Sequence, residues 1–164
     1  MENKRMKNKK LGILTVVPVL LIACMIFLFS GETAEQSRKV SGSLTRQILR
    51  VVISDFDALP EEEQIALVRQ THFWVRKAAH LTEYLLLGLS TAGCFNVWKV
   101  KFPFLTAQIC GSLYAATDEV HQLFVDSRSG EVRDFLIDSF GVFLGIMICR
   151  CIIMIIRKKK KRDA

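Results

Sequence analysis

The residues that could do chemistry gather near the ends of apolar stretches. The candidate catalytic residues are His80, Glu83, Asp118, Glu119 and Asp134. Side chains of these types can act as a general acid or base, and their oxygens suit a divalent cation that prefers oxygen ligands. No spacing among them approaches a strong metal motif such as HExxH, so we predict neither a metal site nor another cofactor. Whether the group catalyses a reaction stays open.

An overlapping set of residues could bind an amphiphile with a charged head group. This binding set comprises Lys77, His80, Tyr84, Glu119, Gln122, Arg128, Asp134 and Asp138. Both signs of charge occur here beside apolar sequence, which suits a polar head joined to an acyl tail. Arg128 would hold a phosphate or carboxylate of the head by a forked hydrogen bond. We also expect Arg128 and Asp134 to belong to one charge network.

Helical spacing places these residues on single faces of three helices. The three faces are Lys77, His80, Tyr84 and Gly88; Gly111, Ala115, Asp118 and Gln122; and Asp134, Asp138, Gly141 and Gly145. Each is polar at one end and small at the other, and small residues permit close helix contact. We therefore expect the polar ends to converge, with small-residue grooves that admit the tail of a ligand. A purely structural polar network that fixes helix register is the alternative.

Composition indicates a membrane protein of one domain. The chain has 164 residues and is 51% hydrophobic, yet it carries 23 Lys and Arg against 16 Asp and Glu, for a net charge of +7. Nucleic-acid binding is disfavoured because the excess positive charge lies beside apolar segments and not along one polar helix. The cysteines all lie in apolar runs without metal-site spacing.

Four stretches are long enough to cross a bilayer as helices, which predicts an all-α, four-helix transmembrane bundle. They are residues 11–30, 77–97, 104–124 and 135–156. Residues 11–156 thus form a single membrane domain between basic tails at 1–10 and 157–164. Within this domain, the sequence pattern of residues 31–75 predicts a loop on the outer face of the membrane, with an amphipathic helix that lies on the membrane surface. The sequence before Cys24 resembles a lipoprotein processing box. Lipidation of Cys24 stays open, although an anchor helix is favoured because the next residues remain apolar.

The lysines predict the topology of these crossings. Both tails and the turn that contains Lys99 and Lys101 are basic, and the positive-inside rule places such segments in the cytoplasm. Four crossings satisfy this placement of all three segments. Residues 31–75 and the turn 125–132 then face outward, and the candidate residues of all three helices lie at the outer leaflet.

Several of these residues resemble the signature of the VanZ-like family of bacterial membrane proteins. The matching pieces are residues 76–80 with Glu83, Tyr84 and Gly88; residues 118–122; and Arg128, Asp134, Gly141 and Gly145. The resemblance implies a multi-pass protein of the bacterial plasma membrane, an envelope function, and low-level glycopeptide resistance of the teicoplanin type. The family commonly has Asn at the position of Asp138, so no role carries over directly to this carboxylate.

Two classes of function follow from the residues and the resemblance. The first is a membrane protein that binds or modulates a lipoglycopeptide antibiotic or a lipid-linked envelope component. The second is an intramembrane hydrolase or transferase, its dependence on a divalent metal left open, acting on a lipid-linked envelope substrate. A transporter ranks third because four helices leave little room for alternating access without dimerisation. The predicted partners are the lipid bilayer and an amphiphile, not nucleic acid, and homo-oligomer formation stays open.

Overall fold

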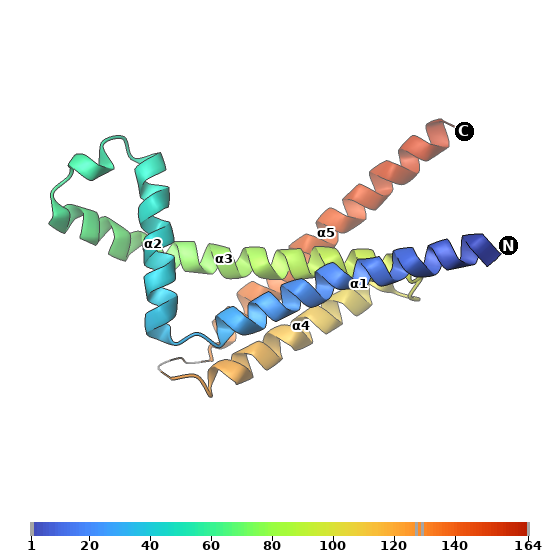
Figure 1. Ribbon diagram of the computed structural model, residues 1–164, viewed down its shortest axis with the longest axis horizontal. Helices are drawn as coiled ribbons and strands as arrows, with labels where there is room; N and C mark the ends of the chain where they lie inside the picture. Colours follow the sequence, from blue (N-terminus) through green and yellow to red (C-terminus); the bar gives the residue numbers. More distant parts are fainter. Residues whose placement is uncertain (1, 127, 129, 164) are drawn as a thin grey trace.

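The longest helix, α3 (Glu61–Val97), is the element against which the other helices pack. The computed structural model describes residues 2–126, 128 and 130–163, with side chains from Gly12 onward. Within this part the chain is all α-helical and contains no strand (Figure 1). The other elements are α1 (Glu2–Ser30), α2 (Ala34–Val52), the short 3-10 helix η1 (Phe56–Ala58), α4 (Pro103–Gln122) and α5 (Val132–Arg162). The predicted all-α class is confirmed.

Glycines bring α3 and α5 into direct backbone contact. A Cβ atom added to Gly88 would collide with the backbone of Val142, and one added to Gly145 would collide with the carbonyl of Leu85. Gly141 approaches the carbonyl of Leu81 in the same way, since a Cβ there would lie 2.7 Å from it. The predicted close contact between small residues is therefore confirmed. The expected small-residue groove for a ligand tail is wrong at these positions, because the facing helix fills it.

The first helix belongs to the same bundle. Ile26 of α1 is buried in the hydrophobic core with residues of α3, α4 and α5. The hydroxyl of Tyr114 donates a hydrogen bond of 2.6 Å to the carbonyl of Ala23, and the Trp98 indole donates one of 3.1 Å to the carbonyl of Gly12. Both bonds join side chains of other helices to backbone carbonyls of α1, at two points far apart along this helix.

The two ends of the bundle differ. Both chain termini and the connection between α3 and α4 lie toward one end, whereas α2 and the connection between α4 and α5 lie at the other (Figure 1). The basic tails and the Lys99/Lys101 turn thus share one end, as the predicted topology requires. We call the opposite end, which carries α2, the α2 end. Ser127 and Ser129 of the predicted outer turn lie outside the described residues.

The amphipathic helix predicted in the outer loop is α2. Its first turn is closed by a capping box, in which the Thr33 side chain accepts from the Gln36 backbone and Gln36 reaches back to the Thr33 backbone. Thr45 and Leu49 are buried on one face, and apolar residues such as Val40 and Val51 are exposed on the other. The helix crosses α3 at the α2 end of the bundle (Figure 1).

Two described stretches are long and apolar enough to cross a membrane: residues Gly12–Ser30 of α1, and α5. The helices α3 and α4 are long, but they carry polar residues such as Glu83 and Asp118 within the predicted spans. The four long helices thus pack together, whereas membrane crossing stays a prediction for all four, supported by length and apolar composition only for α1 and α5. The helix bounds also extend past the predicted spans, since α5 begins at Val132 and continues through the basic tail to Arg162.

Candidate functional site

A polar cavity of about 170 Å³ lies at the α2 end of the bundle. Five segments contribute to it: α2, α3, α4, the connection between α4 and α5, and α5. Its lining residues are Ala34, Arg38, Arg76, His80, Gln122, Arg128, Glu131 and Asp134. Four members of the predicted binding set, namely His80, Gln122, Arg128 and Asp134, therefore line one cavity, which we call the polar cavity.

Three arginines face the polar cavity, and none of them forms an ion pair with a carboxylate among the described residues. Arg128 instead donates a hydrogen bond of 3.1 Å to the backbone carbonyl of Phe29, at the end of α1. Burial lowers the pKa of the Arg128 guanidinium below its usual value, and the positive charge of Arg76 lowers it further. The nearby carboxylates Asp118, Glu32 and Glu119 raise this pKa and oppose these two effects. A guanidinium that is partly desolvated and lies near a second one is stabilised by an anion placed beside it.

The two carboxylates of the polar cavity have basic partners of their own. Asp134 forms an ion pair with Lys77, a residue of α3 that is only 8% exposed. Glu131 pairs with the exposed Arg133 at 3.4 Å. Asp134 is thus paired with Lys77, and no direct ion pair joins it to Arg128 among the described residues. The expected wider network of Asp118, Glu119, Arg128 and Asp134 stays a prediction. The charge left unpaired in the cavity is positive.

A second cavity, of about 210 Å³, lies between α2 and α3, and we call it the α2 groove. It shares Arg76, His80 and Arg128 with the polar cavity, so the two are adjacent. The rest of its lining is largely apolar and includes Phe29, Val40, Leu44, Val75 and Ala79, along with polar residues such as Glu83. The arrangement places an apolar surface directly beside the arginines.

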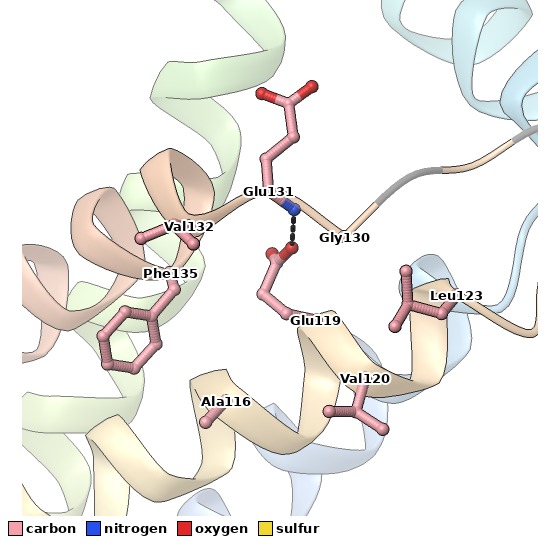
Figure 2. Close-up of a pocket in the computed structure, with 8 residues that line it drawn as sticks. All are labelled: Ala116, Glu119, Val120, Leu123, Gly130, Glu131, Val132 and Phe135. Atoms are coloured by element: carbon pink, nitrogen blue, oxygen red, sulfur yellow. Dashed lines mark hydrogen bonds between the residues drawn. The ribbon is translucent and has the colours of Figure 1, made fainter.

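A third cavity, of about 260 Å³, lies between α4 and the start of α5 (Figure 2). We call it the α4–α5 cavity. Its polar lining residues are Glu119 and Glu131, and the others are Ala116, Val120, Leu123, Gly130, Val132 and Phe135. One carboxylate oxygen of Glu119, Oε2, accepts a hydrogen bond of 2.7 Å from the backbone N–H of Glu131. Glu119 thus ties the connection between α4 and α5 to α4.

The remaining predicted residues lie deeper. Tyr84, Asp118 and Asp138 are at most 4% exposed, and none of them lines the three cavities described above. Asp118 accepts a hydrogen bond of 3.4 Å from Gln122, and it lies near the Tyr84 phenol. Helical phase assigned these residues to the inward faces correctly, and burial confirms that placement. Their membership of the ligand-binding set stays a prediction.

The candidate catalytic residues are distributed over the site. His80 and Asp134 line the polar cavity, Glu83 lines the α2 groove, Glu119 lines the α4–α5 cavity, and Asp118 is buried. Only His80 and Glu83 approach one another closely among the charged pairs of this set, with Nδ1 and Oε2 at 3.9 Å. Among the described residues no group of three or more His, Cys, Asp or Glu is placed to hold a metal ion.

Four lining residues of the polar cavity lie outside the predicted binding set: Ala34, Arg38, Arg76 and Glu131. Of these, Arg76 was named only within the segment 76–80 that resembles the family. Arg76 directly precedes Lys77 and lies one turn before His80, so its position at the end of a predicted span was a usable signal. Arg38 lies on α2, and nothing in the local pattern of residues 31–75 indicates that this helix folds back over α3. Its role depends on tertiary structure.

The described residues thus form an α-helical bundle with two membrane-spanning candidates and a polar cavity at one end, an arrangement consistent with a small membrane protein. The family model described as VanZ/LLP1 matches residues 15–155. The chain therefore belongs to the VanZ/LLP1 family, which confirms the resemblance noted from its residues. No curated protein and no solved structure matches the chain.

Proposed function

We propose that the protein binds an anionic amphiphile of the bacterial envelope, either a lipid-linked component or a lipoglycopeptide, at the outer leaflet. The observation that carries the proposal is the set of three arginines in the polar cavity, which have no carboxylate partner among the described residues. Arginine presents several donors in a fixed fork that matches the geometry of phosphate and carboxylate. A phosphate or carboxylate head group would satisfy these donors and offset their mutual repulsion.

The surroundings of the polar cavity supply the apolar half of the ligand site. The α2 groove shares Arg76 and Arg128 with the polar cavity and continues into apolar side chains such as Phe29 and Leu44. A head group in the polar cavity therefore leaves its chain beside an apolar wall. Binding is proposed first because the arginines adjoin this apolar wall. The catalytic alternative would rest on His80 and Glu83, which both line the α2 groove with Nδ1 and Oε2 3.9 Å apart.

The proposal includes a position in the membrane. All four long helices cross the bilayer, with both termini in the cytoplasm and the α2 end outside. The basic tails and the Lys99/Lys101 turn support this orientation because they share one end of the bundle. The charged pair Lys77–Asp134 then lies near the outer interface, where the cost of burying charge is lower than at the bilayer centre.

Binding to purified protein tests the head-group contact. Native mass spectrometry in detergent compares phosphatidic acid, an anionic phosphate monoester, with zwitterionic phosphatidylcholine of the same chains. We expect wild type to retain phosphatidic acid at least tenfold better, and Arg38→Gln and Arg128→Lys to reduce that preference severalfold. Arg69→Gln is the matched control, since Arg69 is an exposed arginine of the same helix α3 that lines none of the three cavities and forms no ion pair among the described residues. Equal retention of both lipids by wild type would contradict the proposal.

Antibiotic sensitivity tests the physiological part. If the amphiphile is a lipoglycopeptide, expression lowers sensitivity to teicoplanin, which is acylated, more than to vancomycin, which is not. A deletion strain carrying wild type, Arg128→Lys or Arg133→Lys is compared for both drugs. We expect Arg128→Lys to lose the effect and Arg133→Lys to keep it. An equal shift for both drugs would exclude recognition of the acyl chain, and a shift for neither would favour a lipid-linked envelope component.

A further inference from the structure

We infer that the ligand has two apolar arms and that the α4–α5 cavity takes the second arm, through a hydrogen-bond donor that pairs with Glu119. This inference rests on the proposed function and adds to it the chemical class of the ligand: an anionic two-chain lipid with an amide N–H or a hydroxyl where its head joins its chains. The donor would be received in the α4–α5 cavity, whose lining is apolar apart from Glu119 and Glu131.

The cavity has the size and lining of a site for an alkyl chain. Its volume of about 260 Å³ is several times the roughly 30 Å³ that one water molecule occupies in the liquid. Most of its wall is apolar, with Val120, Leu123 and Phe135 on three sides (Figure 2). In a bilayer an alkyl chain that enters such a cavity gains packing contacts with these side chains.

Glu119 gives this apolar cavity a specific polar requirement. The residue is only 8% exposed, and its two carboxylate oxygens have different environments. Oε2 accepts the hydrogen bond from the Glu131 backbone, while Oε1 is buried without a donor among the described residues. In Figure 2 the two oxygens diverge, one toward the Glu131 nitrogen and the other toward the side of Val132 and Phe135. A buried acceptor without a donor is costly, and a ligand that supplies the donor removes the cost.

One ligand can reach both sites because their separating wall is thin. Glu131 lines both the polar cavity and the α4–α5 cavity, so the two cavities adjoin at this residue. The neighbouring Gly130 lies so close to α4 that a Cβ atom there would lie 2.7 Å from the Glu119 carbonyl. The protein backbone therefore passes over α4 at Gly130 with no side chain between them. A head group held by Arg128 is therefore within reach of an arm that bends over this segment toward Glu119.

The Glu119 oxygen without a donor, Oε1, determines which chemical groups are accepted at the junction where the ligand's head joins its chains. An ester or ether junction has only acceptors, which would face the Glu119 oxygen without a hydrogen between them. An amide N–H or a hydroxyl supplies that hydrogen. N-acylated and hydroxylated two-chain lipids should therefore bind better than their ester-linked counterparts with the same head group.

The test uses a matched pair of phosphate monoesters with equal chain lengths: dihydroceramide 1-phosphate, which has an amide N–H and a hydroxyl at the junction, and phosphatidic acid, which has esters. Native mass spectrometry of the detergent-solubilised protein should show wild type retaining the first about tenfold better, which corresponds to 1.4 kcal/mol. Glu119→Gln should reverse or abolish this preference. Its amide oxygen can still accept from Glu131, while its NH₂ group replaces the free acceptor by a donor.

A second pair of variants separates cavity occupancy from folding. Ala116→Phe fills the α4–α5 cavity, whereas Thr117→Phe places the same ring on the exposed neighbouring position of α4. We expect the first to abolish the preference for the amide lipid and the second to leave it intact. If both lipids bind equally in an Arg128-dependent manner and Glu119→Gln changes nothing, this inference is overturned and the proposed function stands. If neither lipid binds in an Arg128-dependent manner, the proposed function fails as well.

Discussion

The same two helices, α3 and α5, meet in different ways along their length. Toward the α2 end they present long charged side chains to one another, as in the ion pair between Lys77 and Asp134. Further along, Gly88 and Gly145 bring the two backbones into contact. Side-chain size at matched positions therefore decides where the bundle is closed and where polar groups and cavities are accommodated. The closed part fixes the helices, and the open part forms the site.

The largest effect is expected from breaking the ion pair of the open part. Lys77→Met leaves the Asp134 carboxylate without its partner in a partly buried position, and we expect a loss of about 3 kcal/mol in stability. The double variant Lys77→Met/Asp134→Leu should recover a large part of this loss because no lone charge remains. Thermal unfolding in detergent measures both. Strictly additive losses would show that the two charges act independently.

A smaller but still large effect is expected in the closed part. Gly145→Ala forces a Cβ atom against the Leu85 carbonyl, so α3 and α5 must separate, at a cost of about 2 kcal/mol. Gly93→Ala is the control, because a Cβ there meets only the Cys149 sulfur at 3.9 Å. It should be neutral or slightly stabilising, since Ala favours helix over Gly by about 1 kcal/mol. Equal effects of the two substitutions would refute the close contact.

The smallest effect is expected at the end opposite the site. Trp98→Phe removes the indole N–H that bonds to the Gly12 carbonyl and should cost about 1 kcal/mol. Trp74→Phe removes an indole that is 69% exposed and has no hydrogen bond among the described residues, so it should be close to neutral. The comparison, again by thermal unfolding, measures how firmly α1 is held there. A larger loss from Trp74→Phe would contradict this assignment.

The closed part could be predicted from the sequence more completely than the open part. Small residues spaced four apart on one helix face indicate that another helix packs closely there. Gly141 and Gly145 of α5 pack against α3 in this way. In the open part, helical phase assigned His80 and Asp134 to the right face. Helical phase indicates which face of a helix a residue occupies, but not how deeply the residue is buried. It therefore could not predict that Tyr84 and Asp138 lie below the cavities. Arg38 could not be placed, because the path of α2 over α3 depends on contacts between segments distant in sequence.

The central claim is that the α2 end, with its three arginines, faces outward, and that the basic end faces the cytoplasm. In a variant without the native cysteines, single cysteines are introduced at Ser43, an exposed position of α2, and at Lys160, near the end of α5. Intact cells are treated with a membrane-impermeant thiol reagent, and permeabilised cells serve as the control. We expect labelling at position 43 in intact cells and at position 160 only after permeabilisation. Labelling of intact cells at position 160 but not at position 43 would contradict the account.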